Sequence, residues 1–236
     1  MGDYTNMSGY YDLIMTSGYY DYPKIVDALM ASQGFQSVLE IGCGTGLILE
    51  ELAKRNTGVE ITGFDLTQAM LNIAEQRLAP YSQVHLIHQN VTGLQLPGRF
   101  DLAFSYGGVW YFVMDGVQAP FMVSHIDDHQ ANWEGLTRVS QHIQPGGHLL
   151  LGIQGPHHNY AAPIRNGYVY SQTIEPLPHG FTKHYFLDDG DQRLMSQRID
   201  YRTYDFEEAL EMLASLGLHH QPSPQGDHSF VRFVKS

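Results

Sequence analysis

The segment Glu40-Ile41-Gly42-Cys43-Gly44-Thr45-Gly46 decides the fold of this 236-residue chain. An apolar run at residues 37–41 leads into it, and residues 47–54 follow with apolar side chains at helical spacing. This order predicts a strand, a tight turn and a helix. Glycines in such a turn let backbone amides approach a ligand closely, and open parallel sheets bind ligands at the carboxyl ends of their strands. We therefore expect a ligand at this turn.

The spacing of the glycines restricts the kind of ligand. The dinucleotide-binding pattern G-x-G-x-x-G needs a third glycine at position 47, but that residue is Leu47 and the third glycine is Gly46. No Gly-Lys-Ser or Gly-Lys-Thr follows, so the phosphate-binding Walker pattern is absent as well. Asp65 ends the next predicted strand, and a carboxylate there can accept hydrogen bonds from both ribose hydroxyls of an adenosine.

Strand and helix patterns alternate up to about residue 155. Pro145-Gly146-Gly147 supplies a turn before the last strand of this series. The alternation predicts a parallel sheet with helices on both faces, joined by right-handed crossovers. The predicted strands are residues 59–64, 84–88, 100–105 and 148–153, and the predicted helices are residues 67–78 and 132–143.

The segments outside this core have other patterns. Residues 168–204 alternate like strands around Asp188-Asp189-Gly190-Asp191, which predicts an antiparallel hairpin or small sheet. Residues 205–217 predict a helix that opens with a capping box, and residues 228–234 have the pattern of a final strand. The first 35 residues hold several tyrosines and an amphipathic helix, and this segment is free to cover the core.

These features together resemble the class I S-adenosylmethionine-dependent methyltransferases, in which E/D-x-G-x-G-x-G closes the first strand and an acidic residue ends the second. The resemblance covers roughly residues 38–153. It implies an α/β fold: a Rossmann-like, mostly parallel seven-stranded sheet with helices on both faces, an N-terminal helical lid and an antiparallel β insertion after the fifth strand. It further implies a single methyltransferase domain over residues 1–236, made of a lid (1–35), a cofactor-binding core (36–155), an acceptor-covering insertion (156–204) and the final helix and strand (205–236).

The resemblance also implies S-adenosylmethionine as cofactor and assigns residues to it. Asp65 would hold the ribose, Leu66 would pack against adenine, and the N-terminal Tyr11 and Tyr20 would contact the cofactor as part of the lid. Asn90 stands where the family commonly has an acidic residue that contacts the adenine amine, and a turn at a strand end is the alternative for this residue. The other expected contacts are Glu40, Gly42, Gly44 and Gly46, beneath the methionine part, with Val91 and Ser105.

The acceptor is expected above the ends of the fourth and fifth strands. Methyl transfer is an in-line displacement, so the enzyme must align a nucleophile, exclude water and, where necessary, remove a proton. His157 or His158 is a candidate general base because imidazole titrates near neutrality, and exposed loop histidines are the alternative. Tyr106 is a further candidate catalytic residue. Around the acceptor we expect Trp110, Tyr111 and Tyr168, although Trp110 and Tyr111 could instead fill the core.

The function implied by the resemblance is methyl transfer to a nitrogen or oxygen of a small metabolite in an enclosed site. A protein that binds the cofactor without turnover, as a sensor or as a subunit, is the alternative. His125 and His129 lie four residues apart, a spacing at which two histidines on a helix share one face and can bind a metal. Magnesium in this family is bound by carboxylates and amides, so we expect no metal and interpret the acidic residues between these histidines as a helix start.

Composition restricts the partners. Thirteen Lys and Arg against 25 Asp and Glu give a net charge of -12, which disfavours nucleic acid and anionic membranes. No apolar run approaches the roughly 20 residues of a membrane span, and the N-terminus lacks the features of a secretory signal. The single cysteine fits a reducing compartment. We expect a cytoplasmic enzyme that acts on a small molecule, and the sequence does not indicate its oligomeric state.

Overall fold

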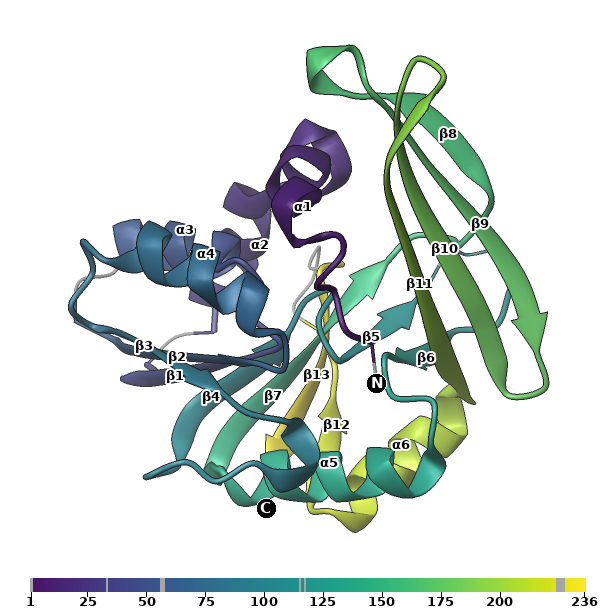
Figure 1. Cartoon of the computed structure of the whole chain (residues 1–236). Coiled ribbons are helices and arrows are strands. Elements are labelled where there is room, and N and C mark those ends of the chain that lie inside the picture. The colour runs from purple at the N-terminus through teal and green to yellow at the C-terminus, as the bar shows by residue number, and fades with distance from the viewer. Residues whose placement is uncertain (1, 33, 56–57, 115, 117, 224–227) are drawn as a thin grey trace.

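The computed structural model describes residues 2–32, 34–55, 58–114, 116, 118–223 and 228–236 (Figure 1). A parallel sheet forms its centre, with strand order β3-β2-β1-β4-β7. The glycine-rich segment follows the strand in the middle of this order. The five strands are β1 (Ser37–Ile41), β2 (Glu60–Asp65), β3 (Val84–His88), β4 (Phe100–Ser105) and β7 (Ile143–Gln154).

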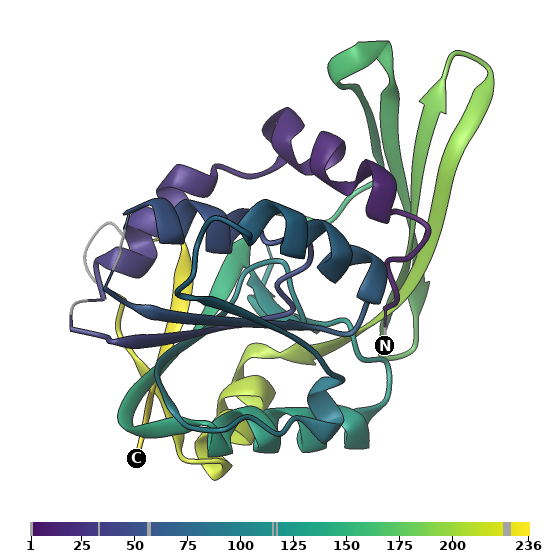
Figure 2. The same ribbon diagram turned by 60° about the vertical axis from the view of Figure 1, so that its left-hand side comes forward.

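Helices cover both faces of this parallel sheet (Figures 1 and 2). One face packs against α2 (Tyr22–Met30), α3 (Leu47–Arg55) and α4 (Gln68–Leu78), and the other against α5 (His129–Gln141) and α6 (Phe206–Ser215). Successive residues of β1 point to opposite faces of the sheet. Val38 packs in the apolar cluster with α2, α3 and α4, while Leu39 and Ile41 pack in the apolar cluster with α5 and α6. The α/β arrangement expected from the sequence is confirmed.

The sequence analysis predicted seven strands, but the sheet has more. Hydrogen bonding in the described part of the chain joins 13 strands, parallel and antiparallel, into one mixed sheet. The physical reason is the length of β7, whose pairing with β4 reaches Leu151, while its last residues, Ile153 and Gln154, pair with β5. The further strands on this side are β5 (Trp110–Val113), β6 (Phe121–Ser124), β11 (Gln192–Asp205), β10 (Gly180–Asp189), β9 (Val169–Leu177) and β8 (Tyr160–Pro163).

At its other edge β7 pairs with β13 (Phe230–Lys235), which pairs in turn with β12 (Leu218–Gln221). Two antiparallel strands therefore follow α6, whereas the sequence analysis expected one strand at residues 228–234. Residues 230–234 of that expected strand lie within β13, and residues 228–229 precede it. The predicted capping box at the start of α6 is wrong as well, because Asp205 and Glu208 form no side-chain cap there. Asp205 still pairs with Phe121 as the last residue of β11.

The N-terminal segment lies beside the long antiparallel strands. Helix α1 (Ser8–Ile14) runs into a π-helical turn (Met15–Tyr19) before α2, and both views place α1 between α4 and strands β8–β11 (Figures 1 and 2). Side chains from these elements share one tyrosine-rich apolar cluster, which includes Met15, Tyr185 and Tyr201. No helix in the described ranges is both long and apolar enough to cross a bilayer.

Candidate functional site

The turn between β1 and α3 requires glycine. Gly42, Gly44 and Gly46 have φ angles of 76°, 53° and 77°, in the left-handed region that side chains disfavour. A Cβ at Gly46 would also lie 2.7 Å from the side chain of Leu78. The backbone amides of Gly42 and Cys43 both donate to the carbonyl of Phe64, which holds the turn against the end of β2.

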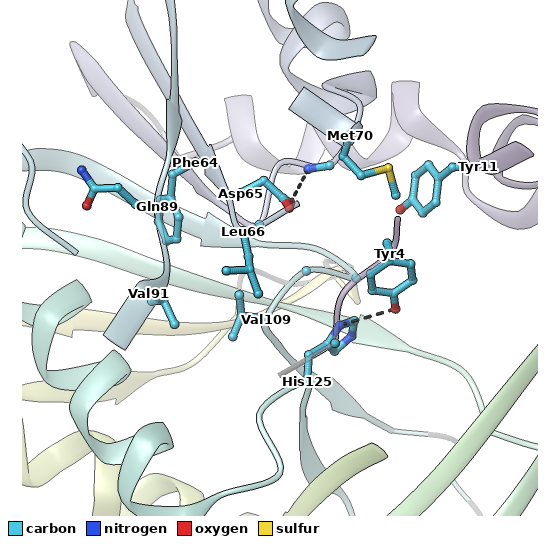
Figure 3. Close-up of a pocket in the computed structure, with 15 residues that line it drawn as sticks. Tyr4, Tyr11, Phe64, Asp65, Leu66, Met70, Gln89, Val91, Val109 and His125 are labelled. Carbon is cyan, nitrogen blue, oxygen red and sulfur yellow. Dashed lines mark hydrogen bonds between the residues drawn. The ribbon is translucent and has the colours of Figure 1, made fainter. Parts of the chain in front are cut away.

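Asp65 ends β2 and faces this turn (Figure 3). One carboxylate oxygen accepts from the amide of Gly44 at 2.9 Å, and the other accepts from the amide of Thr67 at 2.8 Å. Burial raises the pKa of Asp65, and these backbone hydrogen bonds oppose the rise. The carboxylate is therefore fixed in direction beside the glycines.

A first cavity opens beside Asp65 (Figure 3). Its walls combine apolar side chains, glycine backbone and this one carboxylate, which suits an adenosine. Six residues that the sequence analysis assigned to the cofactor line it: Tyr11, Gly42, Gly44, Asp65, Leu66 and Val91. The other lining residues are Gly2, Tyr4, Phe64, Met70, Gln89, Gly107, Gly108, Val109 and His125.

Glu40 lines a smaller cavity at the glycine turn, together with Tyr11, Tyr20 and Tyr106, and this cavity shares Tyr11 and Gly42 with the first. Glu40 is 3% exposed, and its Oε2 atom has no hydrogen-bond partner among the described residues. Burial, and then the charge of Asp65, raise the pKa of this carboxyl. An unpartnered buried carboxylate is costly, so this position is suited to a cationic group of a ligand.

Helix α1 is tied directly to the glycine turn. Asp12 accepts from the hydroxyl of Thr45 at 2.6 Å and forms an ion pair with Arg77 of α4. Arg77 also donates to the carbonyl of Thr45 at 2.9 Å and to Glu50 at 3.0 Å. These bonds hold Tyr11, the neighbour of Asp12, over the first cavity.

A second cavity lies between the glycine turn and the antiparallel strands. It shares Tyr4, Tyr11, Gly107 and His125 with the first cavity, so the two adjoin. Burial raises the pKa of the tyrosines in its wall, so their hydroxyls stay protonated at neutral pH. Its other lining residues are Met15, Tyr19, Tyr20, Tyr111, Gln154, Lys183, Tyr185 and Tyr201.

A third, more open cavity adjoins the second along the segment after β7. His157 lines it, with Nε2 3.3 Å from the hydroxyl of Tyr111, while its buried Nδ1 has no partner among the described residues. Burial lowers the pKa of His157 to about 3, so its imidazole is neutral at pH 7. His158 is exposed and lies 3.2 Å from the carbonyl oxygen of Pro156, outside the wall of these cavities.

Two basic side chains that the sequence analysis did not assign to ligand binding also line these cavities. His125, weighed only as a metal ligand, is buried between the first two cavities, and burial lowers its pKa to about 3. Lys183 of β10 is 2% exposed and lines the second and third cavities. It lies in register with Phe181 and Tyr185 on the buried face of β10, and that alternation was the available signal.

Several predicted site residues lie elsewhere. Trp110 is fully buried in the core and donates from Nε1 to Asn132 at 2.7 Å, because it points to the opposite face of β5 from Tyr111. Ser105 is fully buried beneath it and accepts from the Trp110 amide at 3.4 Å. Tyr168 packs against the tyrosine-rich cluster without lining the cavities described above.

Asn90 has the turn role that was its alternative. It is exposed, and its Oδ1 accepts from the amide and the hydroxyl of Thr92, both at 3.0 Å. The amide oxygen is therefore occupied, and the remaining Nδ2 is only a donor. Acidic residues before α5 mark a helix start as expected, since Asp128 accepts from the amide of Ala131 at 2.7 Å.

Comparison with known proteins agrees with this geometry. Residues 38–122 match the model of a methyltransferase domain. Demethylmenaquinone methyltransferase of Bacillus licheniformis is 31% identical over 153 residues, which are 64% of this chain and 50% of that protein. The chain thus spans about half the length of this curated relative. Ribosomal RNA methyltransferases also match, over shorter stretches.

Solved structures share the fold over nearly the whole chain. An S-adenosylmethionine-dependent methyltransferase from Clostridium acetobutylicum has a TM-score of 0.71 at 18% identity and covers 99% of both chains. The sugar N-methyltransferase KedS8 from a Streptoalloteichus species has a TM-score of 0.71 at 17% identity, covering 95% of this chain and 92% of that one. Residues 38–122 thus match a methyltransferase domain, and the chain as a whole has the fold of the class of S-adenosylmethionine-dependent methyltransferases. S-adenosylmethionine is the cofactor that this class uses.

Proposed function

We propose that this chain transfers the methyl group of S-adenosylmethionine to a nitrogen or oxygen of a small metabolite. The observation that carries the proposal is the pair of adjoining cavities. The first offers a fixed carboxylate and apolar walls to an adenosine, and the second is enclosed by tyrosines at its far side. A protein that only binds the cofactor has no need of the second cavity.

The residues of the first cavity and of the smaller cavity beside it suit the parts of the cofactor. Asp65 would accept hydrogen bonds from the ribose hydroxyls, and Leu66 and Val91 would pack against the adenine. Glu40, with its unpartnered buried oxygen, would receive the ammonium of the methionine part. When bound, the cofactor supplies an electrophilic methyl group on a sulfonium.

Tyr11, held over the turn by Asp12, would close the site from the N-terminal side. Tyr20 would act with it, since its hydroxyl accepts from Gln154 at 3.0 Å at the entrance to the third cavity. Tyr106 packs edge-on against Tyr20, with the ring centroids 5.3 Å apart, and would steady it. These contacts exclude water from the reacting atoms, which in-line displacement requires.

The proposed mechanism relies on alignment more than on proton removal. His157 and His125 are neutral at pH 7, so each imidazole can accept a hydrogen bond from an acceptor O–H or N–H. Their low pKa values make them weak bases, whereas holding the nucleophile in line with the methyl group contributes several kcal/mol, about 7 or more in favourable cases. The sugar N-methyltransferase among the similar structures supports a small-molecule acceptor.

Calorimetric titration with S-adenosylmethionine and S-adenosylhomocysteine, with NAD as control, tests the cofactor half. Incubation with S-adenosylmethionine carrying a ¹³C-methyl group and fractionated metabolite extracts, followed by mass spectrometry, tests the transfer. We expect both sulfur nucleosides to bind, NAD not to bind, and a labelled small-molecule product to appear. Cofactor binding with no product from any fraction would favour the non-catalytic sensor or subunit instead.

A further inference from the structure

Lys183 is a buried lysine that has no carboxylate beside it in the described part of the chain. The residue is 2% exposed, and its Nζ atom lies 4.9 Å from the centroid of the Tyr185 ring. Among the described residues, no carboxylate lies in ion-pair range of Nζ and no hydrogen-bond acceptor is recorded for it. Burying an unpaired ammonium group costs free energy, so a protein rarely keeps a lysine in such a place without a partner.

Apart from Lys183, the described residues that line its two cavities are uncharged at neutral pH. They come from the π-helical turn, from β5, β9 and β11, and from the segments that follow β6 and β7. Neither of the two cavities that Lys183 lines contains an aspartate or glutamate from the described part of the chain. The facing polar residues are Tyr19, Tyr111, His125, Gln154, His157, Gln172 and Tyr201.

We propose that the methyl acceptor carries a carboxylate and that this carboxylate pairs with Lys183 in the second cavity. The inference rests on the proposed function and names the chemical class of its acceptor. A single lysine balances one negative charge, and the other cavity residues add hydroxyl and amide donors but no second cation. A carboxylate fits this set, whereas a phosphate would bring close to two negative charges at neutral pH.

The position of Lys183 also orients such an acceptor. Lys183 lines the second and third cavities but not the first, so its ammonium lies away from the adenosine end of the site. An acceptor anchored there by its carboxylate extends its other end toward His125 and Tyr11, where the second cavity meets the first. Lys183 does not line the cavity proposed for the adenosine, so its charge stays outside that part of the site.

Lysine carbon resonances allow a direct test, because the chain has only four lysines, at positions 24, 54, 183 and 235. Protein labelled with ¹³C at lysine Cε and saturated with S-adenosylhomocysteine is titrated with sodium acetate, and in parallel with acetamide and sodium chloride. The Lys183 signal is identified by its loss in Lys183→Arg. We expect acetate alone to shift this signal saturably and to raise the pKa of Lys183 above about 7.

The turnover test uses the acceptor found in the ¹³C-methyl screen. We expect that acceptor to be a carboxylic acid. Lys183→Met should raise its KM by about tenfold or more with a smaller change in kcat, and Lys183→Arg should restore most of the loss because it keeps the charge. Lys54→Met, on the exposed side of α3, should behave as wild type.

The outcomes separate the two proposals. Failure to bind S-adenosylhomocysteine would remove the proposed function and the inference with it. Binding of S-adenosylhomocysteine together with an unchanged Lys183 signal in acetate, or an equal response to acetamide, would overturn the inference alone. The inference alone would also be overturned if the acceptor proved to be neutral and if wild type and Lys183→Met methylated it equally well.

Discussion

Arg77 and Asp12 form an ion pair that joins helix α4 of the cofactor half to helix α1 of the N-terminal segment. Both side chains also bind Thr45 in the glycine turn, through its carbonyl and its hydroxyl. The N-terminal segment is thus bonded directly to the glycine turn.

Arg77→Met should weaken binding of S-adenosylhomocysteine by about threefold to tenfold, because it releases α1 and lets Tyr11 leave the first cavity. Calorimetric titration measures the change. Arg55→Met is the matched control, since Arg55 pairs with Asp27 and Glu51 away from the cavities. If both variants bind the ligand as wild type does, the ion pair has no part in closure.

Asp65→Asn should lower the affinity for S-adenosylhomocysteine by about 1–3 kcal/mol, because the fixed carboxylate loses its charge and part of its accepting capacity. Glu60→Gln changes an acid at the opposite end of the same strand, where the side chain is mostly exposed, and should have no effect. Equal affinity of Asp65→Asn and wild type would place the ribose elsewhere.

Gly46→Ala should destabilise the protein by about 1–3 kcal/mol, because position 46 has φ of 77° and a new Cβ would meet Leu78 at 2.7 Å. Gly93→Ala is the control, since nothing lies within 4 Å of a Cβ built there. Urea unfolding monitored by circular dichroism compares the two. A loss in Gly93→Ala as large as that in Gly46→Ala would contradict the account of the turn.

Lys183 should make stability rise with pH between about 7 and 10. Its pKa is lowered from 10.5 to about 7 by burial, so over this range the unfolded chain binds the proton and the folded protein does not. Stability then increases with pH, by up to about 1.4 kcal/mol per pH unit for one such group. The increase is absent below about pH 7, where both states are protonated.

Urea unfolding of wild type and Lys183→Met at pH 7, 8 and 9 measures this contribution. The free energy of unfolding of wild type, relative to that of Lys183→Met, should increase from pH 7 to pH 8 and again from pH 8 to pH 9. Parallel pH profiles for the two proteins would show that Lys183 keeps an ordinary pKa in the folded state.

The cofactor half of the molecule is predictable because its signals are local. The glycine turn, the flanking β1 and α3, and Asp65 are adjacent in sequence or follow one period of apolar residues, and the structure places them as the periodicity indicates. Helix α5 begins three residues before its predicted start, at His129, since Asp128 rather than the apolar stripe sets its first turn.

The part of the sheet formed by β5, β6 and β8–β11 depends on pairing between segments that are distant in sequence, which the periodicity of apolar residues does not encode. Strand β5 is only four residues long and buried on both faces, so nothing in the sequence distinguishes the inward Tyr111 from the core residue Trp110. Lys183 escaped notice for a related reason, because a lysine in a strand is expected at the surface. Its neighbours in the fold, Tyr111 and His157, come from other parts of the chain.

Strand β7 belongs to both halves: its first part pairs with β4 and β13, and its last two residues pair with β5. For protein engineering, β7 is therefore the strand that connects the two halves of the sheet. A chimaera that exchanges the antiparallel strands between relatives should keep β7 whole and place its junctions on either side of it, because a junction within β7 would separate the pairing with β5 from the pairing with β4.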